Sequence, residues 1–324
     1  MHDRAPRSLG IPLIAAVGIA ALVAGLLLRP APTMQVAPAE VLGHIESADY
    51  SVPSTLHLSW PNSGQGAIAV QGMGTIATHG PVQNPVPIAS VAKTMTAYLV
   101  LRDHPLGAGQ GGPVITVLPS EAAAYAHEVA LNQSLVRVKS GEQLTERQAL
   151  QALMLASADN VAQILGRWDA GSVTTFLAEM NAAAASLGMA HTRFTDPSGY
   201  DAGTRSTAPD LLILGTAAMA NPAFAQVVAE RSATIPVQGA VTNYNALLGT
   251  HGVIGIKTGS MSASGGCLLF AAQESVGRRE VMLIGVVLGV RGSGSMLSNT
   301  MAAVRVLLRS VESQLTSAMV ATRH

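Results

Sequence analysis

The chain has 324 residues, and its 19 basic and 19 acidic side chains give a formal net charge of zero at pH 7. Without a positive net charge it has no general attraction for nucleic acid, so we expect no nucleic-acid partner. Charged residues make up 12% of the chain and hydrophobic residues 48%, which excludes a disordered protein and suffices for one or two substantial cores.

The N-terminal region contains an apolar segment, residues 11–28, which follows Arg4 and Arg7. As a helix it would be about 27 Å long, close to the thickness of a bilayer. The preceding arginines predict a cytoplasmic N-terminus. We therefore predict a cytoplasmic tip and membrane anchor over residues 1–29, with the body of the protein on the extracytoplasmic side. A cleaved signal peptide, which would release a secreted protein, is the alternative.

A linker rich in proline and alanine is predicted over residues 30–45, followed by a folded domain over 46–315, which carries the motifs described below, and a C-terminal tail over 316–324. Within the domain, strands at 67–71 and 75–78 flank a glycine-containing turn. An extended, proline-containing segment then leads to a helix that begins near Ser90.

The middle of the chain, from about residue 119 to 220, is predicted to be mostly helical. Capping-box patterns open helices at residues 145–148 and 207–210, and an apolar stripe from Phe176 to Leu187 ends at Gly188. Two apolar strands, joined by a polar turn, and a final helix follow at residues 268–273, 281–290 and 298–314. Strands, a helical insertion, strands and a helix together favour one α+β domain with two lobes.

The first chemical motif is Ser90-Val-Ala-Lys93, at the predicted start of a helix. Residues three apart on a helix share a face, so the Lys93 amine is within reach of the Ser90 hydroxyl. The apolar surroundings disfavour an ammonium and favour a free amine, which can act as a base. Alone, this pattern is a weak signal and favours a helix N-cap beside a lysine whose charged end reaches solvent.

Two further motifs follow in the chain. Ser157, Asp159 and Asn160 place a hydroxyl, a carboxylate and an amide at the end of a helix, where they either face a cleft or form an ordinary polar junction. The segment Lys257-Thr258-Gly259-Ser260 precedes the terminal strands. Its lysine and hydroxyl are suited to hold a carboxylate, and its glycine lets a substrate backbone approach closely.

The three motifs in this order resemble those of the penicillin-binding serine acyl-transferases. Residues 87–97, 187–199, 206–208 and 243–248 are similar to the low-molecular-mass D-alanyl-D-alanine carboxypeptidases, and the resemblance extends over about residues 64–308. It implies a β-lactamase/transpeptidase-like fold, in which an antiparallel sheet is flanked by helices and carries an inserted, mostly helical lobe. We expect no cofactor, and the nine scattered histidines indicate no metal site.

The resemblance also implies a reaction. Ser90 would attack the carbonyl between the two terminal D-alanines of a peptidoglycan stem peptide, and Lys93 would accept its proton. Ser157 would relay a proton to the departing D-alanine. β-Lactams would acylate Ser90 as mimics of the same substrate.

Binding roles follow from the same resemblance. Lys257 and Thr258 would hold the terminal carboxylate, beside Gly259. The backbone N–H groups of Ser90 and Ser260 would form an oxyanion hole.

Asp159 departs from the family pattern, which usually has asparagine at this position. An ionised carboxylate cannot donate to the substrate's amide carbonyl, so Asn160 is a second candidate for substrate binding, after a local shift. Asp159 also supports an alternative outside enzymology, a catalytically weak wall-binding or β-lactam-sensing protein. A β-lactamase is less favoured, because no Glu-x-x-Leu-Asn-like segment lies between Ser157 and Lys257. The sequence does not indicate an oligomeric state.

Overall fold

The computed structural model describes residues 56–107, 109–276 and 279–321. The predicted anchor and linker, residues 1–29 and 30–45, lie outside this part of the chain, as does the start of the predicted catalytic domain. Among the described residues, no single helix is long and apolar enough to span a membrane. Helices α7 (Ala208–Met219) and α8 (Pro222–Ala229) meet the length and composition requirements only as a pair bent by 104°.

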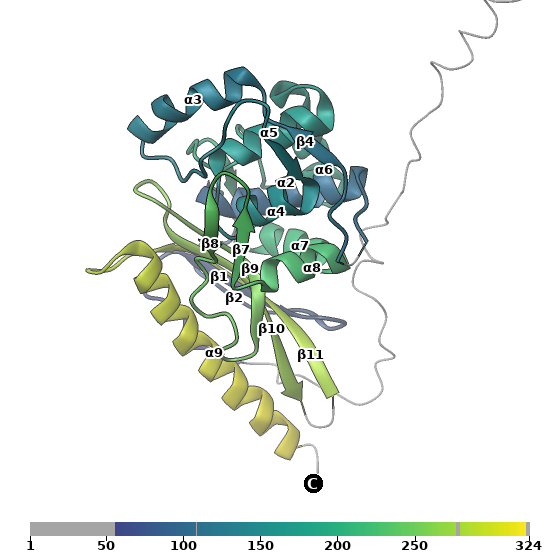
Figure 1. The fold of residues 1–324 in the computed structure, drawn as a ribbon. Coiled ribbons are helices and arrows are strands. Elements are labelled where there is room, and N and C mark those ends of the chain that lie inside the picture. Colours follow the sequence, from purple (N-terminus) through teal and green to yellow (C-terminus); the bar gives the residue numbers. More distant parts are fainter. Residues whose placement is uncertain (1–55, 108, 277–278, 322–324) are drawn as a thin grey trace, which may run out of the picture. The chain divides into compact units, whose positions relative to one another are not determined.

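A five-stranded antiparallel sheet in the order β2-β1-β11-β10-β9 combines the first and last described parts of the chain (Figure 1). Its strands are β1 (Gln65–Val70), β2 (Gly74–His79), β9 (Val253–Met261), β10 (Gly265–Val276) and β11 (Arg279–Val290). The predicted β1–β2 hairpin is confirmed, and glycines at φ 82° and 76° form its turn. Strand β9, which carries Lys257, lies at an edge of the sheet.

Helices cover both faces of the sheet, because side chains alternate between the faces along each strand. On β10, Leu268, Phe270 and Ala272 pack in the core beneath α9 (Met296–Ala321), whereas Leu269 and Ala271 face the core that includes α7. Strand alternation therefore produces a helix–sheet–helix arrangement, as expected for the predicted α+β fold.

The remaining helices form the predicted helical lobe, which is inserted between β2 and β9 (Figure 1). They are α2 (Lys93–Asp103), α3 (Pro119–Ala130), α4 (Glu146–Met154), α5 (Asp159–Ala170) and α6 (Val173–Ser186), with α7 and α8 beneath them. Short strand pairs support this lobe: β3 (Val86–Pro87) with β6 (Arg205–Ser206), β4 (Val114–Thr116) with β5 (Gln143–Thr145), and β7 (Ser232–Ile235) with β8 (Gly239–Thr242).

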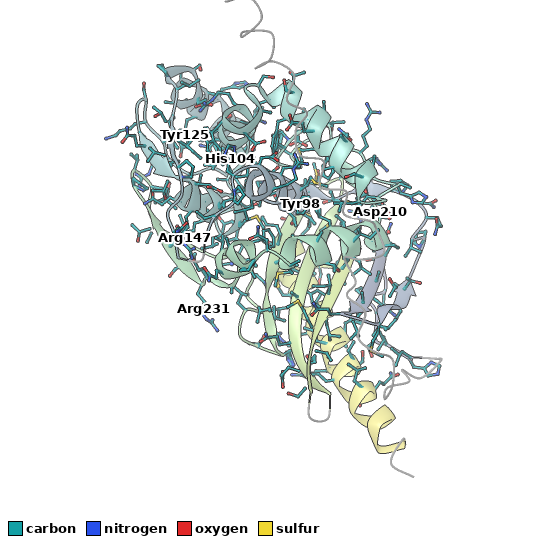
Figure 2. The ribbon with its side chains drawn as sticks, turned by 90° about the vertical axis from the view of Figure 1, so that its right-hand side faces the viewer. Tyr98, His104, Tyr125, Arg147, Asp210 and Arg231 are labelled. Atoms are coloured by element: carbon teal, nitrogen blue, oxygen red, sulfur yellow. The ribbon has the colours of Figure 1, made fainter. Side chains whose placement is uncertain are left out.

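The predicted helix caps are largely confirmed. Thr145 and Gln148 form a reciprocal capping box at the start of α4. Thr207 caps α7 through the backbone N–H of Asp210, but the Asp210 carboxylate accepts instead from His191 N and Thr192 Oγ1, so the second box is only half formed. The Asp210 side chain is labelled in Figure 2. Asp210 thus ties a neighbouring loop to the start of α7.

Two helix ends were predicted with different success. Helix α6 buries the predicted stripe and is followed by Gly188 at φ 81°, which confirms the predicted stop. Helix α9 begins two residues before the predicted start and continues to Ala321, beyond the boundary predicted at residue 315. Its apolar face packs on the sheet through Leu308, Val311 and Leu315, and helical backbone continues after this packed region.

Candidate active site

Ser90 lies in η1 (Ala89–Ala92), a single 3₁₀ turn that leads directly into α2. The helix predicted to begin near Ser90 is therefore present, and its first turn is the tighter 3₁₀ form. Ala89 has a φ of 47°, a left-handed conformation that costs a non-glycine residue on the order of 1 kcal/mol. A Cβ atom at Gly199 would lie 1.8 Å from Ala89 O, so the Gly199 loop packs directly beneath this turn.

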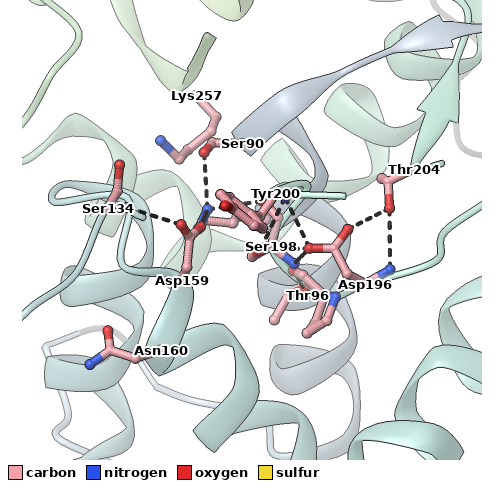
Figure 3. A network of polar contacts seen from close by, with 12 residues as sticks. Ser90, Thr96, Ser134, Asp159, Asn160, Asp196, Ser198, Tyr200, Thr204 and Lys257 are labelled. Carbon is pink, nitrogen blue, oxygen red and sulfur yellow. Dashed lines mark hydrogen bonds and ion pairs between the residues drawn. The ribbon is translucent and has the colours of Figure 1, made fainter. Parts of the chain in front are cut away.

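Lys93 is fully buried, and its amine has three partners (Figure 3). Nζ lies 3.0 Å from Ser90 Oγ, 2.5 Å from Asp159 Oδ1 and 2.9 Å from the carbonyl oxygen of Ser198. Nζ is placed to donate to all three oxygens, and with Asp159 it forms a buried ion pair. Once the proton that faces Ser90 is lost, the lone pair of the amine points at the Ser90 hydroxyl, so the geometry suits proton transfer between Ser90 and Lys93.

Asp159 is the first residue of α5, and donors satisfy both of its carboxylate oxygens. Lys93 donates to Oδ1, and the backbone N–H of Ser134 donates to Oδ2 at 3.0 Å. The Asp159 backbone N–H in turn donates to Ser134 O at 2.7 Å. A negative charge is also favoured at the N-terminus of a helix. The surroundings of residue 159 therefore stabilise a carboxylate, with one donor for each of its oxygens.

Asn160 does not join this cluster. Its amide nitrogen donates to Val136 O at 2.8 Å, and its amide oxygen accepts from Val136 N at 3.3 Å. The side chain is buried and, in Figure 3, lies apart from Ser90 and Asp159. The prediction that Asn160 binds substrate after a local shift is not supported, because its amide already holds the backbone of the preceding loop.

The loop around Ser198 supplies a contact that sequence reasoning missed. The Ser198 carbonyl accepts from Lys93, and the Asp196 carboxylate holds this loop by accepting from Ser198 Oγ at 2.6 Å and from Thr204 Oγ1 at 2.6 Å (Figure 3). Thr96, one helical turn beyond Lys93, donates to Pro197 O. The sequence indicated these residues only through family resemblance, because any residue type can present a backbone carbonyl.

Lys257 projects from β9 toward the same cluster (Figure 3). Its side chain is buried, and Nζ donates to Thr258 O at 3.1 Å. Burial lowers the pKa of Lys257 well below its usual 10.5, and the neighbouring positive charge of Lys93 lowers it further, whereas Asp159 acts in the opposite direction. Burial therefore disfavours the charged form of Lys257 as long as no anion is bound beside it.

Strand β9 packs closely against the turn that carries Ser90. A Cβ atom at Gly259 would lie 3.0 Å from Ile88 O and 3.1 Å from Ser90 N, closer than almost all real Cβ contacts. Thr258 is buried beside it, whereas Ser260 is exposed. Glycine at position 259 thus lets the strand approach the backbone of Ser90.

Ser157 lies in the connection between α4 and α5, two residues before Asp159. It is buried, and its φ of 59° places it in the left-handed region. Within the described part of the chain, no hydrogen bond joins its hydroxyl to Ser90 or Lys93. The structure therefore places Ser157 at the turn predicted for it without a direct link to the Ser90–Lys93 pair.

One acidic group away from this cluster has the spacing of a cation site. Carboxylate oxygens of Asp103, Asp169 and Glu179 lie within 4.8 Å of one another. The guanidinium of Arg102 already binds both oxygens of Asp103, at 2.7 and 2.6 Å. Burial, followed by repulsion from Asp103, raises the pKa of Asp169 to about 7. These features give no connection to the chemistry around Ser90.

Comparison with known proteins agrees with this arrangement. The D-alanyl-D-alanine carboxypeptidase family model matches residues 63–292. The carboxypeptidase DacB2 of Mycobacterium tuberculosis is 37% identical over 210 residues, which cover 62% of this chain and 67% of that protein. A D-alanyl-D-alanine endopeptidase of Pseudomonas aeruginosa is 30% identical over 229 residues, or 68% of this chain and 70% of the relative.

A crystal structure of a Streptomyces DD-transpeptidase has the same fold, with a TM-score of 0.64 and 26% identity. The match covers 81% of this chain and 98% of the Streptomyces chain. The predicted transpeptidase-like fold is thus confirmed. With its serine, lysine and strand motifs on this fold, the chain belongs to the D-alanyl-D-alanine carboxypeptidase family of low-molecular-mass penicillin-binding serine peptidases.

Proposed function

We propose that this serine peptidase removes the terminal D-alanine from peptidoglycan stem peptides through an acyl-enzyme on Ser90. One observation carries the proposal: the Ser90 hydroxyl lies 3.0 Å from a buried lysine amine whose other two contacts are both acceptors. A Lys93 amine that has lost the proton facing Ser90 keeps two N–H groups for those acceptors and turns its lone pair to the hydroxyl proton, as nucleophilic catalysis by serine requires.

Acylation begins when Ser90 Oγ attacks the carbonyl carbon of the D-alanyl–D-alanine bond and its proton passes to Lys93 Nζ. The backbone N–H groups of Ser90 and Ser260 stabilise the oxyanion that forms. The C–N bond then breaks, and the departing amine takes a proton that Ser157 relays. D-Alanine leaves, and the shortened peptide remains as an ester on Ser90.

Water completes the cycle by attacking the ester carbonyl and losing a proton to the Lys93 amine. The C–O bond to Ser90 breaks, and the shortened peptide leaves as a carboxylic acid. Hydrolysis and transpeptidation share the same acyl-enzyme and differ only in whether water or an amine attacks it.

Substrate binding is assigned to strand β9. Its outer edge is free of a strand partner among the described residues, so an extended peptide can pair with it as an added strand. Lys257 and Thr258 then hold the terminal carboxylate, and the close approach of Gly259 to Ser90 brings the carbonyl toward the nucleophile.

The alternative functions are not favoured. A protein that only binds the wall needs no Ser90–Lys93 hydrogen bond, yet this bond is present and Lys93 is also held by Asp159 and the Ser198 carbonyl. The relatives named above are peptidases. No feature of the described residues favours β-lactamase activity over peptidase activity.

The direct test is D-alanine release from a stem pentapeptide by the detergent-solubilised full chain, with Ser90→Ala as control. We expect release that is absent in the control, together with covalent labelling of Ser90 by benzylpenicillin. A folded protein that does neither would contradict the proposal. Formation of a peptide–amine product when glycylglycine is added would indicate transpeptidation by the same acyl-enzyme.

We also propose that the apolar segment of residues 11–28 anchors the protein, with the catalytic domain on the extracytoplasmic side. The support is the length of the uncharged segment and the preceding Arg4 and Arg7. We expect the full chain to sediment with membranes and to resist alkaline carbonate extraction. Recovery of a shortened chain from the soluble fraction would instead indicate cleavage.

A further inference from the structure

In the family pattern the asparagine of the middle motif donates to the substrate's amide carbonyl that precedes the scissile bond, and neither Asp159 nor Asn160 is placed to do so here. An ionised Asp159 has only acceptor oxygens, and both already receive hydrogen bonds. The amide of Asn160 is held by the backbone of Val136. The donor must therefore come from another element.

Ser134 is the residue that the structure brings to this position. Its backbone N–H and carbonyl both bond to Asp159, at 3.0 and 2.7 Å. Val136, two residues after Ser134, has both backbone groups held by the side-chain amide of Asn160. The carboxylate and backbone N–H of Asp159 and the side chain of Asn160 thus hold residues 134–136 next to Asp159, whose other oxygen contacts Lys93.

The side chain of Ser134 remains available. It is exposed, and its hydroxyl makes no hydrogen bond to any residue that the structure describes. Figure 3 shows it beside Asp159, whose other oxygen contacts Lys93. The loop is also held from its other end, because Tyr200, next to the Ser198 loop, donates to Leu131 O at 2.9 Å. A fixed backbone with a free hydroxyl is suited to donate to a ligand without reorganising.

Building on the proposed acyl-transfer function, we propose that the Ser134 hydroxyl donates a hydrogen bond to the substrate carbonyl that precedes the scissile bond. Ser134 is thereby a substrate-contacting residue that performs the donor role usually assigned to the asparagine of the middle motif. Asp159 acts as a positioning residue, because it holds the backbone of Ser134 with one oxygen and the amine of Lys93 with the other.

A pair of β-lactams isolates this hydrogen bond. Benzylpenicillin carries an acylamino carbonyl equivalent to that of the peptide, whereas 6-aminopenicillanic acid lacks it. Acylation rate constants of the full chain in detergent are measured with both compounds for the unaltered protein, Ser134→Ala and Ser134→Thr. Ser140→Ala, which alters another exposed serine of the same loop, is the matched control.

We expect Ser134→Ala to slow acylation by benzylpenicillin about 5- to 10-fold, the usual effect of losing one neutral hydrogen bond, and to leave acylation by 6-aminopenicillanic acid unchanged. Ser134→Thr, which keeps the hydroxyl, should retain most of the rate, and Ser140→Ala should behave as the unaltered protein. An equal loss of acylation rate with both compounds would reveal a structural role of Ser134 and overturn the proposal. An unchanged acylation rate with both compounds would also overturn it.

The experiment distinguishes an error in the proposed acyl-transfer function from an error in the role assigned to Ser134. An unaltered, folded protein that reacts with neither β-lactam would overturn the proposed acyl-transfer function and the role of Ser134 with it. Acylation of the unaltered protein that is insensitive to the Ser134 substitution would overturn the role of Ser134 alone.

Discussion

The amine of Lys93 and the carboxylate of Asp159 form a buried ion pair with an Nζ–Oδ1 distance of 2.5 Å. The second oxygen of Asp159 accepts from Ser134 N, so this side chain receives one donor from α2 and one from the loop after α3. An amide at position 159 cannot accept from both donors. The neighbours of residue 159 are therefore suited to aspartate rather than to the asparagine that is usual in the family.

Asp159→Asn should consequently weaken the protein rather than improve it. If the amide oxygen faces Ser134 N, the amide NH₂ faces Lys93, which then loses its acceptor; in the reverse orientation, Ser134 N loses its acceptor. We expect a loss of about 1–3 kcal/mol in the free energy of unfolding, measured by urea denaturation, and no gain in acylation by benzylpenicillin. A faster acylation would contradict this account.

Gly259→Ala should displace Ser90 without a conformational penalty of its own, since Gly259 does not occupy the left-handed region. The added methyl group would lie 3.1 Å from Ser90 N and 3.0 Å from Ile88 O, so strand and turn must separate. We expect acylation to fall roughly 10- to 100-fold. Gly111→Ala is the matched control, because its nearest neighbour is at 3.4 Å. Equal rates in both variants would argue against this contact.

Lys257 should take up a proton when a carboxylate binds. Its pKa is depressed in the free protein, chiefly by burial, and a bound carboxylate favours the ammonium. Above the lowered pKa the affinity should therefore decrease as pH rises. Titration calorimetry of the Ser90→Ala protein with a stem pentapeptide, in buffers of different ionisation enthalpy, measures this uptake. Lys257→Met should abolish it, and a proton balance of zero before substitution would refute the prediction.

Glu146 should make the protein less stable as pH rises through neutrality. It is buried, its carboxylate oxygens have no hydrogen-bond partner among the described residues, and burial, followed by Asp169, raises its pKa to about 7. The folded state thus binds more protons than the unfolded state between pH 4.5 and 7, so stability decreases across that interval and stays lower above it.

Glu146→Gln removes this titration. We expect similar stabilities for the two proteins near pH 5 and an advantage for the variant on the order of 1–3 kcal/mol at pH 8. Urea denaturation at the two pH values makes the comparison. The same change in the free energy of unfolding between pH 5 and pH 8 in both proteins would show that the Glu146 carboxyl does not titrate in this interval.

Most regular elements could be predicted because their signals are local. Strand alternation, the Thr145 capping box and the glycine stop after α6 each depend on residues a few positions apart. The Ser90–Lys93 contact belongs to the same class, since a separation of three residues in a helix brings two side chains together. The extent of α9 was underestimated, because helical residues continue beyond the apolar face that packs on the sheet.

The contacts that complete the site are of another kind. Asp159 lies 66 residues from Lys93, and Ser198 contributes a backbone carbonyl that its residue type does not reveal. Asn160 follows Asp159 in the chain, yet its side chain turns to Val136. No local rule decides between these directions, because they depend on how α5 packs against α2 and the preceding loop.

The sequence by itself determined the family, the order of strands and helices, and the chemical groups of the three motifs, because these depend on residue identity and short-range spacing. Only the tertiary structure decided which acceptor each amine faces, that Asp159 and not Asn160 contacts Lys93, and that Ser134 joins them. Those choices arise from the packing of two lobes, where a shift of one residue along α5 exchanges a side chain in the site for one in the core.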